Sequence, residues 1–159
     1  MTPIARTIRA VSEPLWWLTK DGDKSCLALY RRHYSAAKAY ADGRERHQFV
    51  GPGESIVLRT AAADAMFVWR RYIDDTIPRQ EGVECAVFRN EAPERWASSE
   101  LIRQADAIAD IAWPGARHYT KVRPSAVRST NPGYCFLAAG WRRAGKTQGG
   151  LTIVEKVAA

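Results

Sequence analysis

The sequence predicts an α+β fold in which a twisted central sheet is flanked by helices. Three observations lead to this prediction: segments rich in Val, Phe, Trp and Tyr, one long amphipathic stretch in the second half, and two short apolar segments around a glycine pair at the end. No repeat, low-complexity tract or composition break divides the 159 residues. We therefore expect a single domain covering residues 1–159.

The first predicted helix runs from Asp21 to about Ala41, with Asp23 in position to cap it. Its apolar stripe consists of Cys26, Leu27, Leu29 and Tyr30. The Gly51-Pro52-Gly53 turn then separates HQFV from SIVLRT, as in a hairpin.

Two strands are predicted next, over Ala65–Tyr72 and Val83–Arg89. The unbroken apolar run Cys85–Phe88 indicates a central strand that is buried on both faces. A helix follows over Ser98–Trp113, capped by Ser98 or Ser99 and ended by Pro114-Gly115. Its apolar face is formed by Leu101, Ile102, Ala105, Ile108, Ala109 and Ala112, and Arg103, Asp106 and Asp110 lie opposite.

The last elements are a strand over Arg117–Val122, a short helix over Tyr134–Ala139 and a hairpin. Asn131-Pro132-Gly133 opens the short helix, and Gly140 closes it as a left-handed cap. The hairpin consists of WRRAGKT and LTIVEKV, joined at Gly149-Gly150.

Composition excludes several classes of protein. No apolar run reaches 18 residues, which excludes a membrane-spanning helix, and the first ten residues lack the apolar core of a secretory signal. Cys26, Cys85 and Cys135 are odd in number and lack CxxC spacing, which argues against a disulfide framework or a zinc knuckle. We therefore expect a protein of the reducing cytoplasm.

The net charge of +7 is confined to one part of the chain. Residues 1–110 contain 16 basic and 16 acidic residues, whereas residues 111–154 contain no acidic residue. The basic residues of that stretch are Arg117, Lys121, Arg123, Arg128, Arg142, Arg143 and Lys146. Such a block is typical of a protein that binds a polyanion, although a solvated basic surface is the simpler interpretation.

The predicted order of strand, helix, strand, helix and hairpin over residues 83–154 resembles the GNAT acyltransferase fold. In that family an Asn-initiated helix ends in a glycine and an aromatic residue before the next strand, and NPGYCFLAAGW at residues 131–141 is similar. The family's glycine-containing loop, which cradles the pyrophosphate of acyl-CoA, is RNEAPERWASS here, at residues 89–99. This loop has no glycine and carries Glu91 and Glu94, which argues against an acetyl-CoA site.

Four segments resemble a narrower family, the Mom proteins of Mu-like phages. They are RHYS (32–35), VFRNE (87–91), SSELI (98–102) and STNPGYCF (129–136). The resemblance implies a transferase, acting in the cytoplasm of the bacterial host, that converts the N6 amino group of adenine in phage DNA to a carbamoylmethyl derivative. This modification protects the DNA from restriction.

The resemblance also implies roles for single residues. His33 and Tyr34 would form the reactive centre, and the resemblance implies iron as a cofactor bound there. No other metal-ligand pattern in the sequence supports a metal. The simpler interpretation of His33 and Tyr34 is a basic helix end with a packed tyrosine. Arg89 would orient the donor, or else form a salt bridge to Glu91 or Glu84.

Tyr134 would transfer a proton in this scheme, and Ser98, Ser99 and Asn131 would bind the donor. The simpler interpretations are a helix cap for the serines, a turn for Asn131 and a core position for Tyr134.

Double-stranded DNA and a small-molecule or acyl-type donor are the expected partners. Phosphates would be bound by the basic block together with Arg31 and Arg32, and Trp96 could stack on an extruded base. A two-fold homodimer would suit duplex DNA, but nothing in the sequence requires one. Two other functions fit the same residues: an acyl-CoA-dependent N-acyltransferase acting on a small amine or a protein, and a non-catalytic DNA-binding module.

Overall fold

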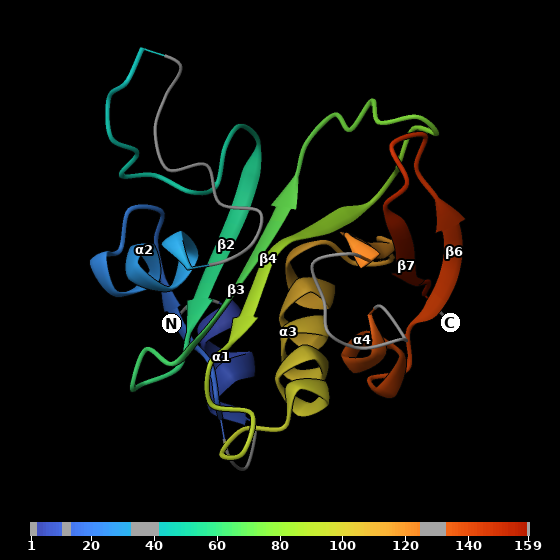
Figure 1. Ribbon diagram of the computed structural model, residues 1–159. Coiled ribbons are helices and arrows are strands. Elements are labelled where there is room, and N and C mark those ends of the chain that lie inside the picture. Colours follow the sequence, from blue (N-terminus) through green and yellow to red (C-terminus); the bar gives the residue numbers. More distant parts are fainter. Residues whose placement is uncertain (1–2, 11–13, 33–41, 125–132, 159) are drawn as a thin grey trace.

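The computed structural model describes residues 3–10, 14–32, 42–124 and 133–158. Its seven strands form one sheet in the order β1-β2-β3-β4-β5-β7-β6 (Figure 1). The strands are β1 (Trp17–Thr19), β2 (Glu54–Arg59), β3 (Ala65–Arg71), β4 (Val83–Asn90), β5 (His118–Val122), β6 (Arg142–Lys146) and β7 (Thr152–Lys156). The described helices are α1 (Pro3–Ala10), α2 (Lys24–Arg31), α3 (Ser98–Ala112) and α4 (Tyr134–Ala138). The predicted α+β fold is confirmed.

The larger core lies between the sheet and α3. Alternate residues of β3, such as Phe67 and Trp69, are fully buried against the apolar face of α3. The indole of Trp69 donates a hydrogen bond of 2.9 Å to the Ala105 carbonyl, and that of Trp16 donates one of 2.7 Å to the Leu101 carbonyl. These bonds satisfy the polar atom of each buried tryptophan, which would otherwise oppose its burial.

The smaller core lies on the opposite face of the sheet, under α2. Met66 and Val68 of β3 are buried in this core together with Leu29 of α2. The predicted cap of α2 is confirmed, since the Asp23 carboxylate accepts a hydrogen bond of 3.0 Å from the Cys26 amide. The helix ends at Arg31 rather than continuing through residue 32, and residues 33–41 lie outside the described part of the chain.

Several expected elements need correction. HQFV (47–50) is a loop rather than a strand: His47 and Gln48 are exposed, whereas Phe49 packs under α2 and its amide bonds to Asp21 (2.8 Å). Helix α3 is capped by Ala97, not by either serine. Asp106 is buried instead of facing solvent, since its partners are His118 of β5, Trp141 just before β6 and Lys156 of β7. Helix α1 and strand β1 were not predicted.

Strand β4 lies in the middle of the sheet, as predicted, but it pairs unequally with its two neighbours. It pairs with β3 along most of its length, with Ala86 left over as a bulge. It pairs with β5, in parallel, only at Val83↔His118 and Glu84↔Tyr119. The C-terminal part of β4 is therefore not paired with β5, and the Phe88 ring contacts Phe136 of α4 instead (5.9 Å).

Gly82 permits the short contact between β4 and β5. Its φ is +124°, a conformation that residues with a side chain rarely adopt, and a Cβ atom there would clash with the Arg117 backbone oxygen.

None of the described helices has the length and apolar character needed to cross a bilayer.

Candidate functional site

A carboxylate shared by two arginines joins the end of α2 to the end of β4. The Arg32 guanidinium donates two hydrogen bonds to Glu91, of 2.6 and 2.7 Å. Arg89, the penultimate residue of β4, donates a third bond of 2.6 Å. We call these three residues the Glu91 cluster. It places Arg89 beside the residue that immediately precedes His33.

The Glu91 cluster has a net charge of +1 because one carboxylate serves two guanidinium groups. The hydrogen bonds from Arg32, and then from Arg89, lower the pKa of Glu91 to about 2, although partial burial opposes this. The terminal nitrogens of Arg89 have no partner among residues 3–10, 14–32, 42–124 and 133–158, and its side chain is 31% exposed. Those nitrogens can bind a planar anion such as a carboxylate.

The loop between β4 and α3 is held by Asn90, a residue that the sequence analysis did not single out. Its side-chain amide donates to the Trp96 carbonyl (2.8 Å) and to the Ser98 hydroxyl (3.0 Å), and its oxygen accepts from the Ala92 amide (3.0 Å). Ser98 thus helps to close this loop, whereas Ser99 makes no such bond within the described chain. An Asn directly after a strand, before a helix, is the signal that could have identified it.

Trp96 is not the free aromatic surface that the sequence analysis expected. It is half-buried against the larger core, and its indole donates a hydrogen bond of 3.1 Å to Asp64. Arg95 lies 3.6 Å from the same carboxylate. In this conformation Trp96 packs the β4–α3 loop onto the sheet, and stacking on a base would require it to leave these contacts.

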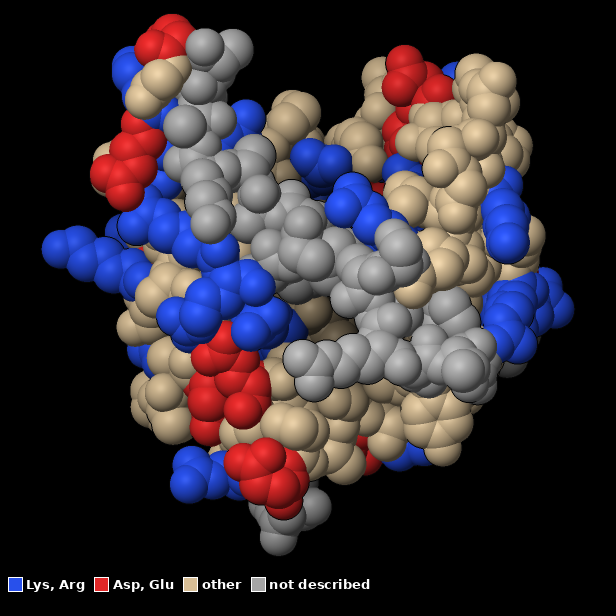
Figure 2. Space-filling model, in the orientation of Figure 1, with Lys and Arg blue, Asp and Glu red and all other residues tan. Residues whose placement is uncertain are grey.

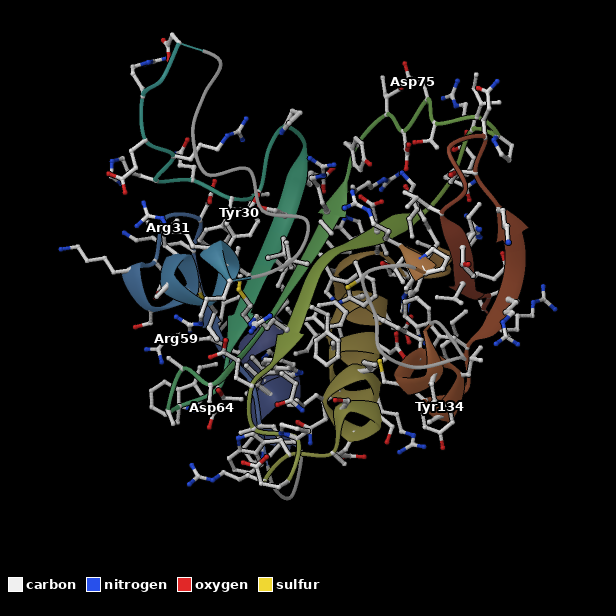
Figure 3. The ribbon with its side chains drawn as sticks, in the orientation of Figure 1. Tyr30, Arg31, Arg59, Asp64, Asp75 and Tyr134 are labelled. Carbon is white, nitrogen blue, oxygen red and sulfur yellow. The ribbon has the colours of Figure 1, made fainter. Side chains whose placement is uncertain are left out.

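Tyr134, the other predicted catalytic residue in the described part of the chain, has no hydrogen bond or ion pair with Arg89. Tyr134 is the first residue of α4 and is 62% exposed. Figure 3 shows Tyr134 pointing outward on the side of the molecule away from Arg31, at the end of α2. His33, Tyr34 and Asn131 lie outside the described residues.

Several of the predicted DNA-binding residues are already paired. Arg31 pairs with Glu45 (2.7 Å), Arg32 with Glu91, and both Arg117 and Arg142 with Glu155 (2.6 and 2.9 Å). The exposed residues on or near the C-terminal strands are Arg123, Arg142, Arg143 and Lys146, and Figure 2 shows basic side chains along the β6 edge. Arg128 lies outside the described residues.

Lys121 belongs to an internal cluster rather than to the exposed basic surface. Its side chain is 12% exposed, and its ammonium lies 2.6 Å from Asp74 and 3.2 Å from Glu84. Tyr119 donates to Asp74 (2.7 Å) and Tyr72 to Glu84 (2.9 Å). The expectation that Lys121 binds DNA phosphate is therefore corrected: it neutralises two buried carboxylates.

This internal cluster has perturbed acidities. Burial disfavours the charged form of Asp74, but hydrogen bonds from Lys121, Thr76 and Tyr119 outweigh it and hold the pKa far below its ordinary value. Burial and the neighbouring carboxylates raise the pKa values of Tyr72 and Tyr119. Glu84 inside an otherwise apolar strand is the signal that could have identified the cluster from sequence.

Cofactor binding finds limited support in the described residues. They contain no group of three or more His, Cys, Asp or Glu side chains that could hold a metal ion, and the potential iron ligands His33 and Tyr34 are not among them. The glycine-free loop after β4 carries Glu91 with its two arginines, an arrangement unlike a backbone cradle for pyrophosphate. Comparison with protein-family models, curated proteins and solved structures finds no match to this chain.

Proposed function

We propose that this protein is a DNA-modifying transferase that attaches a small carbamoylmethyl-type group to N6 of adenine, as the resemblance to the Mom proteins of Mu-like phages implies. The observation that carries the proposal is the Glu91 cluster. Arg89 and Arg32 bind the same carboxylate, that of Glu91, and Arg32 is the residue before His33. These residues come from two of the four segments on which the resemblance rests.

The order of elements also supports the proposal. From β4 onward the chain forms strand, helix, strand, helix and hairpin, the order expected of a GNAT-like fold. The C-terminal part of β4 pairs with β3 but not with β5, and it ends at the Glu91 cluster, so a donor bound there would meet backbone polar groups on the side that faces away from β3.

The Glu91 cluster supplies the binding chemistry. The free guanidinium nitrogens of Arg89 would hold an anionic group of the donor in two parallel hydrogen bonds, and Glu91 would fix the orientation of the guanidinium. The N6 nitrogen of adenine would attack the donor carbon while the leaving group departs with its electron pair. His33 would accept the proton released from N6, with Tyr34 beside it in the sequence. Holding both reactants in position can contribute about 7–11 kcal/mol in ideal cases.

The target adenine must leave the base stack to reach such a centre. Exposed Arg143 and Lys146 on β6, with half-neutralised Arg142, would bind the phosphates of the duplex. Dissolved cations compete with these side chains for the DNA phosphates, so the affinity for DNA should fall steeply as the ionic strength rises.

Mass spectrometry of nucleosides tests the proposal. Plasmid DNA is isolated from bacteria that express the full chain, digested to nucleosides and compared with DNA from cells expressing Arg89→Gln or Tyr34→Phe. We expect a heavier deoxyadenosine with the wild type and its loss with both variants. Arg79→Gln, which removes an exposed arginine paired with Glu81 (3.2 Å), is the matched control and should retain the modification.

The alternatives give different results in the same experiment. A conventional N-acyltransferase would leave deoxyadenosine unmodified and would bind CoA in solution. A non-catalytic module would bind duplex DNA with a steep salt dependence that decreases in Arg142→Gln/Arg143→Gln, and would also leave the nucleoside unmodified. Unmodified DNA from well-folded, abundant protein would therefore refute the proposed reaction.

A further inference from the structure

Trp17 of β1 is the most exposed tryptophan of the chain. All six tryptophans lie in the described part of the sequence, and 56% of the Trp17 surface is open to solvent. The others are buried or, in the case of Trp96, half-buried: Trp16, Trp69, Trp96, Trp113 and Trp141. Trp17 therefore offers a large aromatic face that a planar ligand can cover.

Strand pairing places Trp17 on the same face of the sheet as Arg89. Trp17 pairs with Arg59, which pairs with Met66. Met66 pairs in turn with Arg89. Side chains at directly paired positions point to the same face, and Met66 lies in the smaller core, so this is the face that α2 covers.

The distance along this row of residues follows from the spacing of strands. Neighbouring strands lie about 4.8 Å apart, so three spacings separate the backbones of Trp17 and Arg89 by roughly 14 Å. Stacked nucleotides of one strand are about 3.4 Å apart, and unstacked ones are farther apart. A DNA strand bound at Arg89 would therefore reach Trp17 within about two to four nucleotides.

Arg59 lies beside the Trp17 ring and is fixed there. Its guanidinium carbon is 5.9 Å from the centre of the ring, within the range of a cation–π contact. The guanidinium donates to two backbone carbonyls of the turn after β2 (3.1 and 3.2 Å), and its Nε lies 3.5 Å from the Asp23 carboxylate. A base that stacked on Trp17 would meet a cation already held in position.

The surroundings of Trp17 are positively charged. Lys20 and Lys24 are exposed on either side of the turn that leads from β1 into α2. The carboxylates of this turn are engaged within the protein, since Asp21 accepts a hydrogen bond from a backbone amide (2.8 Å) and Asp23 lies against Arg59. Three cations and two carboxylates give the region a net charge of +1, which favours an anionic strand.

Trp17 also lines an uncharged hollow at the β1 edge of the sheet. The hollow has a volume of about 370 Å³, and its other lining residues are Ala5, Ile8, Pro14, Trp16 and Leu18. These walls carry no charge for a phosphate, but they suit the flat, neutral surface of a nucleobase. Cations outside and an aromatic, apolar surface within are the combination by which proteins bind single-stranded nucleic acid.

We propose that Trp17 stacks on an unpaired base of the DNA strand that carries the target adenine, a few nucleotides from that adenine. The inference rests on the proposed function, because it takes DNA as the substrate and Arg89 as the place of the reaction. It gives Trp17 the stacking role that Trp96, bonded to Asp64, does not fill. Because only an unpaired base can be stacked, the protein should favour a strand that is locally open.

The experiment measures the binding of two fluorescein-labelled oligonucleotides to the full chain by anisotropy. One is a short oligodeoxyadenylate, and the other has the same length and the same phosphates but abasic sugars throughout. We expect Trp17→Ala to weaken binding of the oligodeoxyadenylate roughly tenfold and to leave binding of the abasic strand unchanged. Trp17→Tyr should keep most of the affinity, and thermal melting verifies that both variants fold.

Ile73→Ala is the matched control, because Ile73 is an exposed apolar residue (78%) beyond the opposite end of β3 and should leave both affinities unchanged. Unchanged binding of the oligodeoxyadenylate by Trp17→Ala would overturn the inference, as would an equal loss of affinity for both strands. A wild type that binds neither strand also overturns it. If deoxyadenosine is unmodified as well, the proposed function fails with it, whereas modified deoxyadenosine leaves that proposal standing.

Discussion

Replacing Glu91 with glutamine removes the negative charge that holds Arg32 and Arg89 together. Three hydrogen bonds, all between 2.6 and 2.7 Å, lose their charged acceptor, and two like-charged guanidinium groups remain side by side. We expect Glu91→Gln to unfold more easily than the wild type at pH 7. In the proposed reaction it should also lower the yield of modified adenine, because the guanidinium of Arg89 is no longer held in one orientation.

The magnitude follows from the acidity of Glu91. A fall of its pKa from 4.5 to about 2 corresponds to about 3 kcal/mol of additional stability when the carboxylate is charged. The Arg32 side chain is 51% exposed, so solvent screens part of this interaction. We expect a loss of about 1–2 kcal/mol in the free energy of unfolding.

The pH dependence distinguishes this contribution from a general loss of packing. Because the pKa of Glu91 is lower in the folded state, its contribution is complete above about pH 4.5 and is lost progressively as the pH falls toward 2. The assay is urea unfolding followed by tryptophan fluorescence between pH 7 and pH 3. The deficit of Glu91→Gln should be largest at pH 7 and shrink toward pH 3.

Glu94→Gln is the matched control, since Glu94 is an exposed glutamate in the same loop and makes no ion pair within the described chain. The reasoning is refuted if Glu91→Gln is as stable as Glu94→Gln at pH 7, or if its deficit is the same at pH 7 and pH 3.

Three further predictions concern stability and reactivity. Lys121→Met should lower the free energy of unfolding by about 3–5 kcal/mol in urea denaturation, because Asp74 and Glu84 lose their buried counter-ion; a loss below 1 kcal/mol would contradict this. Gly82→Ala should destabilise by about 2 kcal/mol or more, measured by thermal melting, through its positive φ and the clash of the new Cβ with the neighbouring strand. Burial raises the pKa of the Cys135 thiol to about 11, so the folded chain should react with a thiol-specific disulfide reagent at pH 8 far more slowly than the unfolded chain, and equal rates would refute the assignment.

The regular part of the fold was predictable because its elements have clear sequence periods. Helix α3 repeats apolar residues every three to four positions, and β4 is continuously apolar over Cys85–Phe88. Asp106 was misplaced because its charge was taken to put it on the polar face, although it follows Ile102 by four residues and precedes Ala109 by three and so lies at the edge of the apolar face. Its burial depends on His118, Trp141 and Lys156, which are distant in sequence.

The candidate site was predictable only where its contacts are local. The salt bridge of Arg89 to Glu91, two residues away, was one of the two interpretations offered for Arg89, and it is confirmed. The third member, Arg32, lies 59 residues from Glu91, and no local pattern indicates that contact. Likewise, Lys121 could not be separated from the exposed basic residues by sequence, because Asp74 reaches it only through the loop between β3 and β4.

The brief pairing of β4 with β5 has a mechanical consequence. In the described part of the chain, only Val83 and Glu84 of β4 pair with β5 and so join a half-sheet of four strands to one of three, which leaves side chains packed against α3 to set much of the angle between the two halves. A substitution in that packing could change the separation of β4 and β5 beyond Glu84 without breaking a strand pair in either half. The relative orientation of the two half-sheets could therefore change over evolution while each half-sheet, and the stability it provides, is retained.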